Sequence, residues 1–225
     1  YSPDGSQIAL VTPTTISLIN SDGSNRRSDV LVYPFVYTYS EWAYHAQPVW
    51  SADGSFLRVL IPPQDSLGDL SANTQIYQIP TDGRPASLIG NILTSPLQFP
   101  TFSPDLNRIA FTQQVGAPAD NIYSLNFANY DGGGSTEYTR GGFDFESWST
   151  DSSHFAYSAR SPRTVSFGQV GAGGSTPLDA NPATSIGWVS ADRFLFLAYP
   201  GEETELRVGS IGAPSSLIAN LGSGS

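Results

Sequence analysis

Apolar and polar positions along this chain follow a period of two and predict β-strands. The segments Thr15 to Ile19 and Gln75 to Ile79 alternate between polar and apolar side chains, as a strand with one buried face does. A short apolar run precedes each alternating segment and predicts another strand. These runs are Gln7 to Val11, Phe56 to Ile61, Arg108 to Thr112, His154 to Ser158 and Arg193 to Ala198.

A short motif of an aromatic residue, a Ser, a small residue and an Asp comes before every apolar run. Its four clear copies and looser fifth copy begin at Tyr1, Trp50, Phe102, Trp148 and Trp188. The Asp residues of these copies are 41 to 52 residues apart, at Asp4, Asp53, Asp105, Asp151 and Asp192. This period is close to the ~40 to 45 residues of a four-stranded propeller blade.

Each copy has the composition of hairpins joined in a meander. The second, alternating strand is Thr15 to Ile19, Gln75 to Ile79, Asn121 to Leu125 or Leu206 to Val208. A turn pair follows, as Asp22-Gly23, Asp82-Gly83, Asp131-Gly132, Gly173-Gly174 and, less clearly, Ile211-Gly212. Such pairs supply the positive φ angles that tight hairpins need.

The five motif Asp residues are predicted to be structural turn residues. Ser and Asp side chains accept hydrogen bonds from backbone N–H groups two or three residues on, and a following Gly relieves the left-handed position. The preceding aromatic is expected to fill the gap to the neighbouring blade. A role for these Asp residues as calcium ligands or acid–base catalysts is the less favoured alternative.

The motif and its two following strands resemble the TolB-like, or PD40, family of WD40-like propeller repeats over essentially all 225 residues. Four copies match well, whereas the fifth lacks the Gly and has one residue inserted after Trp188. The resemblance implies an all-β propeller of four-stranded antiparallel blades. We expect one propeller domain, with blades at about 1–45, 46–96, 97–143, 144–184 and 185–225.

The first predicted blade has no segment for its innermost strand before Tyr1. Two interpretations remain open. Either a five-bladed ring tolerates an incomplete blade, or the sequence is a fragment of a ring with six or more blades. The fragment is slightly favoured, because an open ring leaves unpaired strand edges.

The long connections of the meander are predicted to share the face opposite the Asp and Gly turns. They are Tyr33 to Gln47, Pro62 to Asn73, Gln113 to Asp120, Arg160 to Arg163 and Tyr199 to Thr204. Because loops on a rigid scaffold collect binding residues, this face is the candidate binding surface. Its candidate residues are Tyr39, Trp42, Tyr44, His45, Asp65, Asp69, Tyr199 and Glu202.

The segment Tyr33 to Tyr44 has six aromatic residues in twelve positions. Alternation at Tyr33, Phe35, Tyr37 and Tyr39 is typical of an outer strand that packs on the next blade. The alternative is an aromatic patch, with Trp42, Tyr44 and His45 exposed, that suits a protein partner or a sugar ring.

Charge and composition exclude several classes of function. Twenty acidic residues against ten basic ones, all Arg, give a net charge of −10, which repels nucleic acid. With no Cys there is no disulfide or thiolate nucleophile, and no apolar run is long enough to span a bilayer. The absence of Lys and Cys suits an exported bacterial protein, extracellular or periplasmic. No cofactor or metal is expected.

Catalytic motifs are scarce. Only His45 and His154 are present, and no nucleophile-elbow or zinc-protease motif occurs. His154 is expected to be a surface turn residue, and the pairs Glu202 with Glu203 and Asp65 with Asp69 to be solvated surface charges. We therefore expect a non-catalytic scaffold that binds protein, or a glycan. The alternatives are the accessory propeller of a larger enzyme, such as a prolyl-oligopeptidase-like serine peptidase, and a hydrolase that uses Asp144 or Glu146.

Overall fold

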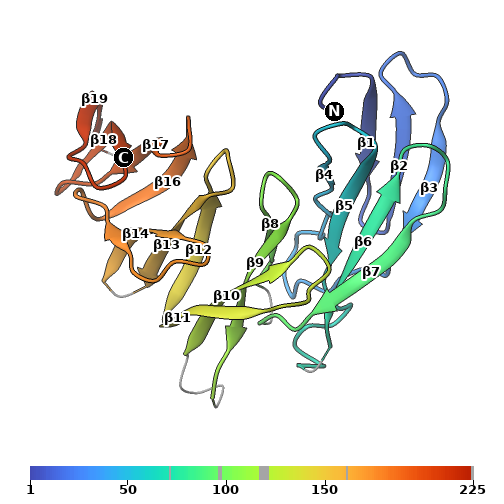
Figure 1. Cartoon of the computed structure of the whole chain (residues 1–225), viewed down its shortest axis with the longest axis horizontal. Helices are drawn as coiled ribbons and strands as arrows, with labels where there is room; N and C mark the ends of the chain where they lie inside the picture. Colours follow the sequence, from blue (N-terminus) through green and yellow to red (C-terminus); the bar gives the residue numbers. More distant parts are fainter. Residues whose placement is uncertain (71, 96–97, 117–121, 161, 224–225) are drawn as a thin grey trace. The chain divides into compact units, whose positions relative to one another are not determined.

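The computed structural model describes residues 1–70, 72–95, 98–116, 122–160 and 162–223. These residues form nineteen β-strands and no helix, arranged in five antiparallel sheets of strands that follow one another in sequence (Figure 1). The chain is all-β, as predicted. Its strands divide between two compact units, the first made of residues 1–111 and 128–135 and the second of residues 112–127 and 136–225.

The sheets follow the order of the predicted repeats. The first has three strands, β1 (Gln7–Val11), β2 (Thr15–Asn20) and β3 (Arg27–Val32). The second has β4 (Val49–Trp50), β5 (Phe56–Ile61), β6 (Thr74–Pro80) and β7 (Ser87–Ile92). The third has β8 (Thr101–Phe102), β9 (Arg108–Gln114), β10 (Tyr123–Asn129) and β11 (Thr136–Gly141).

The last two sheets lie in the second unit. The fourth has β12 (Phe143–Trp148), β13 (His154–Arg160), β14 (Arg163–Gln169) and β15 (Thr176–Pro177). The fifth has β16 (Ala183–Trp188), β17 (Arg193–Ala198), β18 (Glu203–Ser210) and β19 (Ser216–Ser223).

The predicted strands coincide with the observed ones to within a few residues. The bounds of β1, β5 and β17 are the predicted ones, whereas the strand expected from Asn121 is β10, which begins at Tyr123. Asn121 itself, like half of the connection Gln113 to Asp120, lies outside the described residues. The turn expected at Gly173-Gly174 is wrong by three residues, because β14 ends at Gln169 and the turn follows at residues 170–171.

Each of the first four motif turns is held by the same local hydrogen bonds. In the second copy, Ser51 Oγ donates to Asp53 Oδ1 at 2.7 Å, and the same oxygen accepts from Ser55 N at 3.0 Å. Ser51 Oγ also accepts from Phe56 N, and Ser51 O accepts from Gly54 N. Asp4, Asp105 and Asp151 make the equivalent Ser and backbone contacts. The prediction that these carboxylates are structural is therefore supported by geometry.

The fifth turn departs from this pattern, as its inserted residue indicated. Ser190 Oγ still donates to Asp192 Oδ1, at 3.1 Å. The backbone closes differently, because the N–H groups of Val189 and Ser190 both donate to Arg193 O.

These hydrogen bonds favour the charged carboxylate and make the turns sensitive to acid. They hold the pKa of Asp53 at about 2, below its ordinary value of 3.8, chiefly through the N–H of Ser55 and the hydroxyl of Ser51. A lowered pKa means stability that is present above about pH 4 and is lost as the pH falls through 2. We expect the stability of Asp53→Asn, measured by urea unfolding, to fall less steeply than that of the wild type between pH 4 and 2. Equal slopes would contradict this.

The motif aromatics pack as expected in the second unit. The ring of Trp148 on β12 lies 5.3 Å from that of Phe127 on β10, and Trp188 on β16 lies 5.6 Å from Phe167 on β14. Each therefore contacts the third strand of the preceding sheet, and large aromatic surfaces are removed from water. Tyr1 is the exception: its side chain is 78% exposed, so the expectation that it fills such a gap is wrong.

The core of the first unit has two clusters of buried hydrophobic side chains, most of them aliphatic. One joins β2 to β5 and β6 through residues such as Ile16, Leu57 and Ile79, which are fully buried. The other joins β6 to β9 and includes Ile76 and Ile109. This packing fixes the strand ends from which the long connections depart.

Candidate functional site

The aromatic segment from Tyr33 to Pro48 is an irregular loop of the first unit. β3 ends at Val32, so the interpretation of this alternation as an outer strand is wrong. Further along the loop, Tyr39 has a φ of 57°, in the left-handed region, which also interrupts an extended backbone. The loop is anchored instead by single contacts, including Tyr33 Oη to Thr12 O and Tyr37 N to Gln64 O.

Tyr44 is one of the anchors of this loop. The aromatic-patch alternative places its side chain at the surface, and this part of it is wrong, because only 9% of the side chain is accessible. Its hydroxyl donates to Leu60 O at 2.9 Å, and its ring stacks on Phe99 at 5.5 Å. Burial raises the pKa of Tyr44 well above its ordinary value. The side chain holds the loop against β5 and forms the floor of the site.

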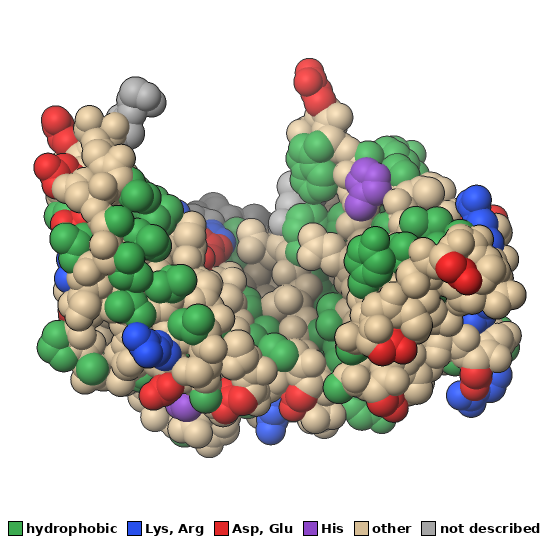
Figure 2. All heavy atoms as spheres, turned by 90° about the horizontal axis from the view of Figure 1, so that it is seen from above, with side chains coloured by type: hydrophobic (Ala, Val, Ile, Leu, Met, Phe, Trp, Pro, Cys, Tyr) green, Lys and Arg blue, Asp and Glu red, His purple; other side chains and the backbone are tan. Residues whose placement is uncertain are grey.

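A cavity of about 370 Å³ opens beside Tyr44. Trp42, His45 and Phe99 line it, together with Pro62 and Pro100 and several residues of β4, β5 and β8. Trp42 and Phe99 are half-exposed, and their rings meet edge to face at 6.3 Å. Trp42, Tyr44 and His45, the three residues of the aromatic-patch alternative, thus line one cavity. Figure 2 shows hydrophobic side chains gathered at the surface around a histidine.

Sequence reasoning missed Phe99 and Pro100, which come from the connection between β7 and β8. The only signal was that this connection is one of the loops between blades, which belong to the long-loop face. Nothing local pairs Phe99 with a tyrosine 55 positions earlier in the chain.

Tyr39 and Asp65 form a second contact between loops of the first unit. Tyr39 Oη donates to Asp65 Oδ1, and the same oxygen accepts from Leu67 N at 3.2 Å and Gly68 N at 2.7 Å. The tyrosine hydroxyl contributes most to lowering the pKa of Asp65, and the pKa of Tyr39 is raised in turn. Asp65 thus orders its own loop, in which the exposed Asp69 follows.

Tyr199 and Glu202 belong to the second unit, whereas the residues above belong to the first. Tyr199 is half-buried, and its hydroxyl lies 2.9 Å from Thr184 Oγ1. Glu202 is exposed in the turn before β18. His154, expected in a surface turn, is the half-buried first residue of β13.

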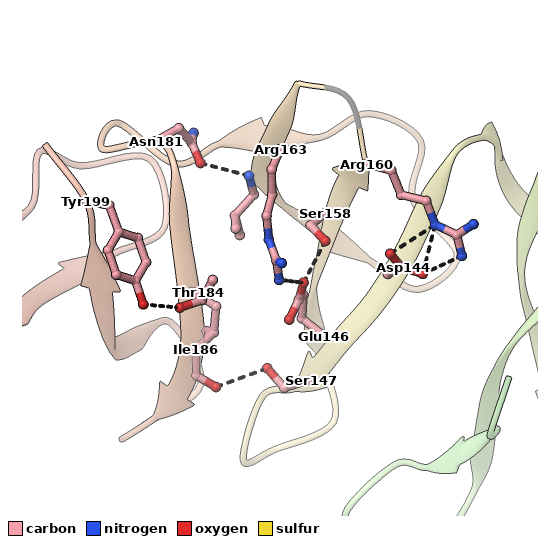
Figure 3. Close-up of polar contacts among 11 residues, drawn as sticks. Asp144, Glu146, Ser147, Ser158, Arg160, Arg163, Asn181, Thr184, Ile186 and Tyr199 are labelled. Atoms are coloured by element: carbon pink, nitrogen blue, oxygen red, sulfur yellow. Dashed lines mark hydrogen bonds and ion pairs between the residues drawn. The ribbon is translucent and has the colours of Figure 1, made fainter. Parts of the chain in front are cut away.

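The two carboxylates of β12 are both engaged with arginines (Figure 3). Arg160 donates from Nε to both oxygens of Asp144, and from Nη2 to Oδ1 at 2.6 Å. Glu146 Oε1 accepts from Ser158 Oγ at 2.6 Å and from Arg163 Nη2 at 3.3 Å. Both carboxylates therefore take part in ion pairs and hydrogen bonds within the second unit.

The described residues contain neither a candidate metal site nor a candidate membrane-spanning helix. No three His, Asp or Glu side chains in these residues lie close enough together to hold a metal ion. The same residues contain no helix that is long and apolar enough to cross a membrane.

Comparison with known proteins identifies the fold. No protein-family model matches the chain, and no curated protein matches it in sequence. Among solved structures, it is similar to TolB from Acinetobacter baumannii, with a TM-score of 0.56, 16% identity and coverage of 96% of this chain. It is also similar to the β-propeller domain of the Trilobed protease from Pyrococcus furiosus, with a TM-score of 0.58, 12% identity and 95% coverage. The chain has a TolB-like propeller fold.

The similar solved structures belong to proteins of different sizes and kinds. This chain spans 53% of the TolB chain and 68% of the Trilobed protease propeller chain. It also matches an acylaminoacyl peptidase from Pyrococcus horikoshii, with a TM-score of 0.62 and 12% identity over 97% of this chain, but only 37% of the peptidase. At these identities the likeness shows the propeller fold and no particular activity.

Proposed function

We propose that this propeller is a non-catalytic scaffold that binds a protein partner through the loops of its first unit. The supporting observation is a set of five large aromatic side chains on these loops that are 44 to 60% exposed, which we call the aromatic surface. Its members are Phe35, Tyr37, Tyr39, Trp42 and Phe99.

Clusters of exposed aromatic side chains are typical of surfaces that bind other proteins. They supply a large contact area with few rotatable bonds, and Trp and Tyr are enriched among the residues that contribute most to binding. The cavity beside Trp42 and Phe99, at about 370 Å³, offers a recess for one large side chain of the partner. Since Tyr44 and Asp65 fix the loops before binding, little ordering entropy is lost when a partner docks.

The same surface could also take a glycan, because sugar rings stack on aromatic faces. We favour a protein, since a sugar needs hydrogen-bonding groups around the ring. The cavity lining is mainly aromatic, aliphatic and proline side chains, with Gln47, Thr101 and His45 as its polar members. The composition without Lys or Cys supports an exported protein, in the periplasm or outside the cell.

Capture of the partner by the tagged, intact protein tests this function. We expect Trp42→Ala and Phe99→Ala each to weaken capture at least tenfold, because truncating such an anchor costs about 2 kcal/mol or more. Val189→Ala is the matched control, since this side chain is 59% exposed but lies in the second unit. Tyr44→Ala is unsuitable, because it removes the hydrogen bond to Leu60 O. Unchanged capture by both variants would refute the proposal.

A second candidate is supported by the size of the peptidase relative. Because the chain corresponds to 37% of that peptidase, it also fits an accessory propeller beside a catalytic domain. In that case the natural full-length protein should react with a fluorophosphonate probe for serine hydrolases. A natural protein that does not react would leave the scaffold as the better description.

A further inference from the structure

A second hollow lies within the aromatic loop of the first unit. Its volume is about 510 Å³, and it is lined by Phe35 and by every residue from Tyr37 to Ala43. Four of the lining side chains are the exposed rings of Phe35, Tyr37, Tyr39 and Trp42. The hollow is also lined by the side chain of Glu41, which carries a carboxylate and is exposed. A hollow with aromatic walls and one carboxylate is a suitable environment for an organic cation.

The rings attract a cation because aromatic faces carry negative electrostatic potential, greatest for Trp. Phe35 and Tyr37 stand edge to face, with centroids 6.1 Å apart and planes at 66°, so the walls of the hollow are not all parallel. The hydrogen bond from Tyr39 to the Asp65 carboxylate holds that ring in place and makes it richer in electrons. The backbone of Tyr39 is also left-handed, with a φ of 57°, and strained positions of this kind cluster at binding sites.

Charge on the surrounding loops has one sign. Residues 33–48, 62–73 and 93–101 contain Glu41, Asp65 and Asp69 but no Arg, and the whole chain has no Lys. The cation–π contacts among the described residues use Phe56, Tyr130 and Tyr123 instead. None of the residues that line the hollow is an arginine. The net charge of −10 favours the approach of a basic partner.

We propose that this hollow binds an arginine side chain on an extended segment of the partner protein. A guanidinium is flat, stacks on rings and donates to a carboxylate with a fork of N–H groups, so it can use Trp42 and Glu41 together. The ammonium of lysine is more strongly hydrated and has no flat face to stack on a ring, so it suits these walls less well. This inference rests on the proposed function and specifies the chemistry of the partner.

Ligand-observed NMR with defined peptides tests the assignment. The probe is acetyl-Gly-Gly-Arg-Gly-Gly-amide, titrated against the intact protein, with lysine and citrulline in place of arginine as comparisons. We expect the arginine side-chain methylene protons to move upfield, because they enter the shielding region of the rings. The lysine peptide should bind several-fold more weakly, and the neutral citrulline peptide should not shift.

Three variants test whether the peptide binds in the hollow or is attracted only by the negative charge of the whole protein. Trp42→Leu should weaken binding about fivefold, and Glu41→Gln about threefold, within the range of exposed cation–π and ion-pair energies. Glu202→Gln removes the same charge from an exposed loop of the second unit and should change nothing. Circular dichroism checks that each variant is folded.

The outcomes distinguish this inference from the proposed function. Equal loss with Glu41→Gln and Glu202→Gln, or no upfield shift, would overturn the arginine site. Equally tight binding of tetramethylammonium would overturn it too, in favour of a general site for organic cations. If the peptide fails but capture still depends on Phe99, the scaffold function stands and only the arginine assignment falls. If both fail, both proposals fall.

Discussion

We expect Phe155→Ala to lower the free energy of unfolding by about 3–5 kcal/mol, the usual cost of removing a buried aromatic ring. Phe155 on β13 is fully buried in the second unit. Its ring centroid lies 4.5 Å from that of Phe127 and 4.9 Å from that of Tyr138, and Trp148 and Tyr157 complete the surroundings. These rings come from the third and fourth sheets, so the cavity would open where the two sheets pack together.

Urea denaturation followed by circular dichroism measures this loss. Phe35→Ala is the matched control, because the same ring is removed from a side chain that is 44% exposed in the aromatic loop. Its stability should remain within about 0.5 kcal/mol of the wild type. A loss below 1 kcal/mol for Phe155→Ala would mean that neighbouring rings collapse into the space.

Gly90→Ala is expected to cost more than about 3 kcal/mol or to prevent folding, because overpacking here meets backbone rather than a movable side chain. Gly90 lies on β7, and a Cβ atom there would overlap the carbonyl oxygen of Asp131. On the opposing turn, a Cβ at Gly132 would overlap the carbonyl oxygen of Asn91. The outer strand of the second sheet and the β10–β11 turn therefore approach each other backbone to backbone within the first unit.

The control for this clash is the same substitution in open space. Gly173 has nothing within 4 Å of its added Cβ and no positive φ. Gly173→Ala should leave stability unchanged or raise it slightly, since alanine restricts the unfolded chain. Thermal unfolding of the two variants makes the comparison. If Gly90→Ala also stays within 1 kcal/mol of the wild type, the close approach of the two backbones is incorrect.

The strands and turns could be predicted from sequence because their determinants are local. The Ser and Asp of each motif make their hydrogen bonds within five residues, as Ser51 and Asp53 do with Ser55 and Phe56. Alternation then fixes which side chains of β6 point inward, because register follows from the turn. The exact bounds of β1, β5 and β17 follow from this local specification.

The candidate site was predicted only in part, because its contacts join distant segments. Trp42 and His45 were identified as exposed from the density of aromatic residues, but Tyr44 is buried because of Leu60 and Phe99, which no local pattern links to it. The alternation of aromatic residues in the same segment predicted a strand where the structure has a loop. A pattern of side-chain types does not reveal backbone conformations such as the left-handed one of Tyr39.

The two ends of the sheets differ in how their connections are specified. At one end, Ser, Asp and the backbone make hydrogen bonds to one another in the first four copies, so the shape of each turn is specified within a few residues. At the other end, connections of unequal length are free to accumulate insertions and new side chains. Related proteins can therefore evolve a new binding specificity by changing only these loops, while the sequence that specifies the strands and motif turns stays the same.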